Sequence, residues 1–177
     1  MTIGHGLIGL SIGAIMIPPA WNARRKLASF LAMVLAAYVP DLPLPHWGHD
    51  LYYISHSLFV TLGLMAVAAG ILWRCPRLRG GTGGWPLAGA LMLAWASHLL
   101  LDSFYAHGGG VAMFWPLSRA SLALPMPWFG SLHRPFLVIT RNTVRVFAAE
   151  AVFYGTVLAA CLAWRFTRNR LRAEPAR

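Results

Sequence analysis

A histidine and an aspartate stand four residues apart in an apolar stretch, as His98 and Asp102. In a helix this spacing places both side chains on one face, one turn apart. An imidazole and a carboxylate in this arrangement can share a metal ion. A structural hydrogen bond between them explains the same spacing, so the pair by itself leaves both interpretations open.

Other acidic or histidine residues also lie in or beside apolar segments, where polar side chains are costly and commonly functional. They are His5, Asp41, His56 and Glu150. Asp41 and His56 would complete a set of four nitrogen and oxygen ligands with His98 and Asp102. This set suits zinc and is acceptable to manganese or iron, and a cation would neutralise the buried carboxylates. Taken singly, Asp41 is equally explained as a turn residue after Pro40 and His56 as a solvated interface residue.

The composition is that of a membrane protein. The 177 residues suffice for a single domain, predicted to span 1–177. Hydrophobic residues make up 58% and charged residues 11%, against about half and a quarter in soluble proteins. A net charge of +10 on a soluble domain would indicate nucleic-acid binding. Here the cations lie between apolar runs, so we expect membrane insertion and no nucleic-acid partner.

Five apolar stretches predict an all-α, polytopic helical bundle of about five spans. They are Gly4–Ile17, Leu27–Val39, Ile54–Trp73, Trp85–Ala106 and Val144–Trp164. The first is short, because 14 residues of helix reach only ~21 Å against ~30 Å of hydrocarbon. A signal peptide is the alternative for this stretch, but no Lys or Arg precedes it.

The distribution of cations predicts the orientation. Eleven Lys and Arg residues follow the first, third and fifth stretches, whereas four lie between the second and third or between the fourth and the start of the fifth. The positive-inside rule then places the C-terminus in the cytoplasm and the N-terminus outside. All six polar residues named above fall at one depth near the outer face, so we expect the metal site there.

The segment from Gly108 to Thr140 alternates aromatic residues with prolines. We expect it to lie along the outer interface, either as a membrane-surface cap or as a lid over a lipid-facing cavity. Further polar residues on this side, including Asp50 and His133, are ambiguous; His46 and His49 could be ligands but better fit exposure, and His107 is a candidate additional ligand. Arg141 and Arg145 either reach lipid headgroups or clamp a substrate phosphate. No disulfide is expected between Cys75 and Cys161.

Several motifs resemble one family. The segment Ser97–Asp102 (SHLLLD) is followed by Gly108–Gly110 and by Phe114–Ser118 (FWPLS). With Pro40-Asp41, Ser55-His56-Ser57 and His5, these motifs resemble the inner-membrane metal-dependent hydrolases, also described as LexA-binding, inner-membrane-associated hydrolases. Two positions depart from that pattern, since Pro43 replaces a second acid and Leu51–Tyr53 replaces His-Arg-Gly. The resemblance implies a bacterial inner-membrane location.

The order of the ligand candidates is more distantly similar to that of bacterial zinc phospholipase C and related single-strand nucleases. This likeness implies one metal on Asp41, His56, His98 and Asp102, and a second on His5 with Asp102. The later histidine pair of those enzymes is missing here, and Val146 stands where one of its members would precede Glu150. One or two zinc ions are therefore expected, with Mn²⁺ or Fe²⁺ as alternatives.

The residues and the resemblance together predict a metal-dependent hydrolase that cleaves a phosphoester in a lipid or lipid-linked substrate at the outer membrane face. A bound metal would activate water. Asp41 or Glu150 would act as a base, and Arg141 and Arg145 would stabilise charge on the phosphoryl oxygens. The alternatives are a proton-coupled transporter and a non-catalytic module that a metal stabilises.

Overall fold

The computed structural model describes residues 3–42, 54–74, 84–105, 110–124 and 139–173. Within these ranges the chain forms α-helices, one short 3₁₀ turn and an isolated β-bridge between Val111 and Leu122. The helices are α1 (Gly4–Met16), α2 (Ala23–Tyr38), α3 (Leu58–Arg74), α5 (Gly84–Ser103) and α6 (Arg141–Ala173), with η1 (Val39–Asp41) after α2. The predicted all-α class is confirmed for this part of the chain.

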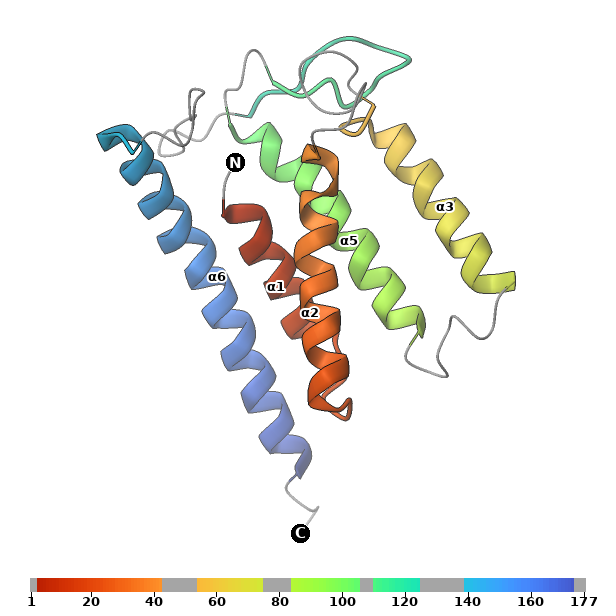
Figure 1. The fold of residues 1–177 in the computed structure, drawn as a ribbon, viewed down its shortest axis with the longest axis vertical. Helices are drawn as coiled ribbons and strands as arrows, with labels where there is room; N and C mark the ends of the chain where they lie inside the picture. The colour runs from red at the N-terminus through yellow and green to blue at the C-terminus, as the bar shows by residue number, and fades with distance from the viewer. Residues whose placement is uncertain (1–2, 43–53, 75–83, 106–109, 125–138, 174–177) are drawn as a thin grey trace.

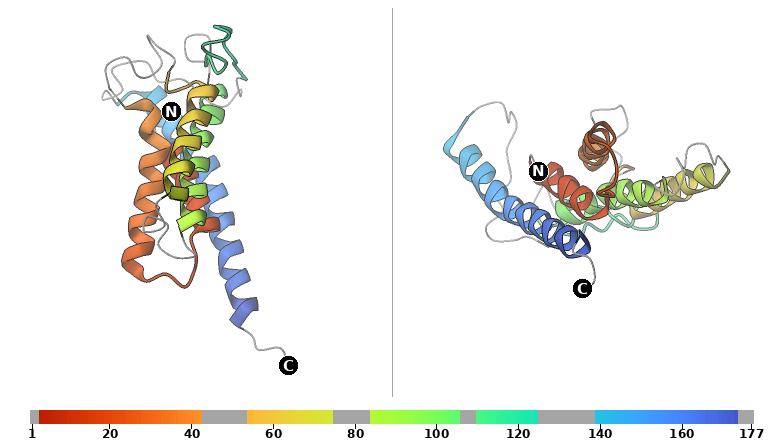
Figure 2. Two further views of the ribbon diagram at one scale, coloured as in Figure 1. Left: turned by 90° about the vertical axis from the view of Figure 1, so that its right-hand side faces the viewer. Right: turned by 90° about the horizontal axis from the view of Figure 1, so that it is seen from below.

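Helix α1 lies at the centre of the bundle and contacts α2, α5 and α6, while α3 packs on α5. Figure 1 shows that α1, α3 and α6 begin at one end of the molecule, where α2 and α5 end. Helix α6 ends at the opposite end of the molecule, and the views in Figure 2 agree with this arrangement. We call the shared end the site end, because every candidate ligand in the described residues lies there.

Glycines on α1 let it approach α2 closely. A Cβ added at Gly9 would lie 2.8 Å from the backbone oxygen of Met33, and one added at Gly13 would lie 2.8 Å from the ring of Phe30. Small residues at such contacts are typical of helices that pack in membranes. The close approach brings the first turn of α1, which carries His5, toward the end of α2.

Among the helix starts that differ from the predicted stretches, those of α2 and α3 illustrate capping by polar side chains. Helix α2 begins at Ala23, before the predicted Leu27, since the side chain of Asn22 accepts a hydrogen bond from the amide of Arg25 at 2.8 Å. Helix α3 begins at Leu58, after the predicted Ile54, since the Ser57 hydroxyl accepts from the amide of Val60 at 3.3 Å. As a result His56 lies in the turn before α3 and not within a span.

In the described ranges, one helix is long and apolar enough to cross a membrane: Arg141–Leu171 of α6, with only 17% of its most apolar window buried. Three shorter apolar helices cover Gly4–Met16, Leu58–Ile71 and Leu87–Ser103. The surface of α2 is also apolar, because Leu27, Leu31 and Leu35 are 62%, 55% and 67% exposed. Leucines that recur every four residues on an exposed helix face suit lipid better than water.

Part of the predicted interfacial segment is described. The carbonyl of Met113 accepts from the amide of Leu58 at 2.8 Å, and the carbonyl of Trp115 accepts from the Ser57 hydroxyl at 2.5 Å. These bonds attach the segment to the start of α3, at the site end. Phe114 and Leu117 are exposed there at 45% and 80%. Residues 125–138, which carry the rest of its aromatic and proline pattern, lie outside the described ranges.

Candidate metal centre

His98 and Asp102 lie one turn apart on α5, and both side chains are fully buried. His98 Nε2 is 3.2 Å from Asp102 Oδ2. The other ring nitrogen, Nδ1, donates to the carbonyl of Ala37 at 2.7 Å. That carbonyl belongs to the last turn of α2, where helical carbonyls lack partners in their own helix. The bond holds a proton on Nδ1 and turns Nε2 toward Asp102.

Asp41 and His56 complete a compact group with this pair. His56 Nε2 lies 3.1 Å from His98 Nε2 and 3.2 Å from Asp102 Oδ2. Asp41 Oδ1 lies 3.5 Å from the Nε2 atoms of both histidines. Two imidazole nitrogens at 3.1 Å require a shared proton or a shared cation, because two lone pairs repel each other. The sequence-predicted set of four residues therefore converges in space.

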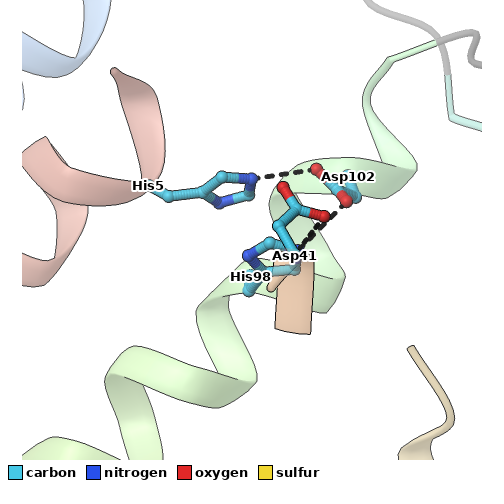
Figure 3. Close-up of side chains that lie close together, drawn as sticks. All are labelled: His5, Asp41, His98 and Asp102. Carbon is cyan, nitrogen blue, oxygen red and sulfur yellow. Dashed lines mark ion pairs between the residues drawn. The ribbon is translucent and has the colours of Figure 1, made fainter. Parts of the chain in front are cut away.

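His5 joins the group from the first turn of α1. Its ring stacks on that of His98 with centroids 3.8 Å apart, and its Nε2 lies 3.0 Å from Asp102 Oδ1. Asp102 thus faces His5 with one oxygen and His56 and His98 with the other. Figure 3 shows His5, Asp41, His98 and Asp102 converging from α1, η1 and α5. Ligand atoms of His5, Asp41, His98 and Asp102 all lie within 4.8 Å of one another, so the group could hold a metal ion.

Burial distinguishes the members of the group. His5 and His98 are 0% exposed and His56 is 1% exposed, whereas the Asp41 side chain is 28% exposed. The group contains two carboxylates and three imidazoles in a largely buried environment. A cation bound there would neutralise the carboxylate charges. Asp41 marks the side on which the described part of the group is open to its surroundings.

Glu150 lies at the site end but its described bonds are to α1. Its Oε2 accepts hydrogen bonds from the amides of Ile3 and Gly4, both at 2.9 Å, and the side chain is fully buried. Reasoning from the sequence missed this role. The available signal was the start of α1, where the N-cap residue Ile3 has no side chain able to accept a hydrogen bond.

The remaining predicted residues lie apart from the group or outside the described ranges. Arg141 and Arg145 are exposed in the first two turns of α6, and in the described structure no contact joins them to the group. Their assignment as a phosphate clamp, like that of Asp41 or Glu150 as a base, stays a prediction. Cys161 is a free, half-buried thiol. The residues outside the described ranges are His46, His49, Asp50, Cys75, His107 and His133.

The fold and the site define an all-helical protein with a buried cluster of histidines and aspartates at one end of its bundle. Residues 1–171 match the family model of the YdjM inner membrane proteins, and the chain belongs to that family. The family places the protein at the inner membrane, in agreement with the predicted location. No curated protein matches the chain, and no solved structure does.

Proposed function

We propose that this protein is a metal-dependent hydrolase, and that Asp41, His56, His98 and Asp102 hold its metal. The spacing of the ligand atoms carries the proposal of a metal site, since five of the six separations between them run from 3.1 to 3.5 Å. Ligand atoms that surround a tetrahedral zinc ion at ~2.0–2.1 Å lie about 3.3 Å from one another. These five separations are compatible with a tetrahedral zinc ion, and Mn²⁺ or Fe²⁺ are alternatives for the same donor types.

His5 supports a site for a second ion. It faces the oxygen of Asp102 that is turned away from the other two histidines. A carboxylate with histidines on both of its oxygens is suited to bridging two cations. With a single ion, the same contact would orient Asp102 as a ligand.

The reaction that we propose is hydrolysis of a phosphoester in a lipid or lipid-linked substrate. A bound divalent ion lowers the pKa of coordinated water to roughly 7, which supplies a nucleophile at neutral pH. Within the chain, Ala37 orients His98, and the partly exposed Asp41 marks the direction of substrate approach. Arg141 and Arg145 would bind the substrate phosphate from the start of α6, since guanidinium groups pair with phosphate oxygens.

The topology that we propose has five spans, with the N-terminus and the metal site outside and the C-terminus in the cytoplasm. It is supported by the exposed leucines of α2 and by the position of the arginines on α6. Arg165, Arg168 and Arg170 lie in the half of α6 remote from the site end. Cations concentrate on the cytoplasmic side of membrane proteins, so the metal centre would face the outer leaflet.

Two other functions fit the described side chains less well. A proton-coupled transporter would distribute acidic and histidine side chains across the membrane. In the described ranges all of them lie at the site end. A non-catalytic module would close the metal with four protein ligands and leave no position for water. Proton flux in liposomes would support the first, and a metal site without turnover would support the second.

The decisive assay follows phosphate-ester release by the purified protein in detergent. We expect the zinc-loaded protein to cleave a phospholipid headgroup faster than a water-soluble aryl phosphodiester, because the proposed topology would place the site at lipid-headgroup depth. A chelator should abolish both reactions and added zinc should restore them. Turnover that persists unchanged after complete metal removal would contradict the proposal.

A second prediction concerns Ser55, whose hydroxyl lies 2.8 Å from His56 Nδ1. Groups that bond the remote nitrogen of a ligating histidine orient the ring, and their loss commonly weakens metal affinity by about 10–100-fold. We expect Ser55→Ala to weaken zinc binding by about 10-fold. Ser97→Ala is the matched control, because Ser97 adjoins His98 but bonds the carbonyl of Ala94 in its own helix. Equal affinities for both variants would exclude the role of Ser55.

A further inference from the structure

The two ends of α1 present the same physical problem. At its start, the amides of Ile3 and Gly4 have no acceptor within the helix, and Ile3 offers no capping side chain. At its end, the carbonyl of Ala14 would accept from residue 18, but Pro18 has no N–H. Unpaired backbone groups are especially costly in a membrane, so each end needs a partner from elsewhere in the chain.

Helix α6 supplies both partners, with opposite charges. The carboxylate of Glu150 accepts from the two amides at 2.9 Å, and the guanidinium of Arg165 donates to the carbonyl of Ala14 at 2.8 Å. An anion at the start and a cation at the end of a helix both complement its dipole. Gly13 already accepts from the amide of Ile17, so Ala14 is the carbonyl that depends on Arg165.

The separation of Glu150 and Arg165 along α6 also matches the length of α1. Glu150 and Arg165 are about 22 Å apart along α6, and the 13 residues of α1 extend about 20 Å. The helices lie side by side and run in the same direction (Figures 1 and 2), so one pair of charges spans α1 from end to end. Among the described helices, the backbone of α6 closely approaches α1 alone, while its Tyr154 side chain packs with Leu101 and Tyr105 at the end of α5.

We propose that Glu150 and Arg165 clamp α1 at a fixed depth along α6 and thereby position His5 against Asp102. His5 directly follows Gly4, and its Nε2 lies 3.0 Å from Asp102 Oδ1. A slip of one helical turn would displace His5 by ~5.4 Å and separate the two groups. Glu150 is then a positioning residue rather than a catalytic base. The consequence for metal binding rests on the proposed function, whereas the clamp itself does not.

Hydrogen exchange at the amide of Gly4, measured by NMR on metal-free protein in detergent, tests the clamp. Glu150→Ala removes the acceptor, and we expect exchange to accelerate by about 10-fold or more. Glu150→Gln keeps an acceptor oxygen and should stay much closer to the wild type. Unchanged exchange in Glu150→Ala would overturn the clamp, whatever the metal result. If that variant does not fold, Glu150→Met takes its place, because methionine keeps a side chain of similar length without the carboxylate oxygen that accepts the bond.

The other end of α1 has its own control. We expect Arg165→Gln to lower the unfolding temperature by about 2–4 °C, while Arg168→Gln has little effect. Arg168 lies one turn further along α6 and stacks over Trp164, with its guanidinium carbon 5.0 Å from the ring centre. Equal shifts in both variants would show a general effect of charge at this end and would overturn the assignment of Arg165.

A double-mutant cycle on zinc affinity tests the connection to His5. We expect Glu150→Ala to weaken zinc binding by about 10-fold in the wild-type background and to have no further effect once His5 is alanine. Equal effects in both backgrounds would show that Glu150 acts by another route. A wild-type protein that takes up no zinc would contradict the metal centre instead, and exchange at Gly4 would then decide the clamp alone.

Discussion

The variant His98→Ala should lose its bound zinc and retain roughly a thousandth of the hydrolytic rate, since a catalytic metal supplies several kcal/mol of transition-state stabilisation. His98 is central to the cluster: its Nε2 lies within 3.5 Å of ligand atoms from His56, Asp41 and Asp102. The measurements are zinc content by mass spectrometry and release of a phosphodiester headgroup.

The variant His98→Asn distinguishes a structural role of His98 from its role as a metal ligand. Its amide nitrogen can replace Nδ1 as the donor to the Ala37 carbonyl, which His98 now bonds at 2.7 Å. The variant keeps that bond but presents no imidazole nitrogen to the cluster. We expect it to fold and unfold as the metal-free wild type does, yet to bind no zinc. Stoichiometric zinc in a folded His98→Asn protein would remove this residue from the ligand set.

The second large effect that we expect is that of zinc binding on thermal stability. Zinc at about 1,000 times its dissociation constant should stabilise the folded protein by about 4 kcal/mol, because the ion binds the folded state alone. For a chain of this size that corresponds to roughly 8–16 °C in the unfolding temperature. Adding zinc to chelator-treated protein, and following unfolding by calorimetry or intrinsic fluorescence, measures the shift.

Asp102→Asn should abolish this zinc-dependent shift. Asp102 is fully buried and faces histidines with both oxygens, so the amide removes the charge and replaces one of the two oxygens. Glu150→Gln is the matched control, since it makes the same chemical change at another buried carboxylate of the site end. We expect that control to keep most of the shift. A zinc effect of equal size in Asp102→Asn would contradict the proposed metal centre.

Much of the fold follows from short-range features of the sequence. The apolar stretches predict the helices, and Pro40 ends α2 at the expected place, with Asp41 in the turn that follows. The caps at Asn22 and Ser57 moved two helix starts by a few residues, because a single side-chain hydrogen bond outweighs an apolar pattern at a terminus. The number of membrane spans does not follow from the apolar stretches alone. Among the described helices, α6 is long and apolar enough to cross a membrane, whereas α1 has only 13 residues.

The sequence alone determined which residues could form the candidate site. The spacing of His98 and Asp102 places them on one helix face whatever the tertiary structure, and the charge pattern predicts that His5, Asp41 and His56 lie at the same membrane depth. Only the tertiary structure decided how these groups meet. It turned the two oxygens of Asp102 toward different histidines and assigned Glu150 and Arg165 to the ends of α1. Those contacts depend on the relative rotation and depth of helices far apart in the chain, which local periodicity does not encode.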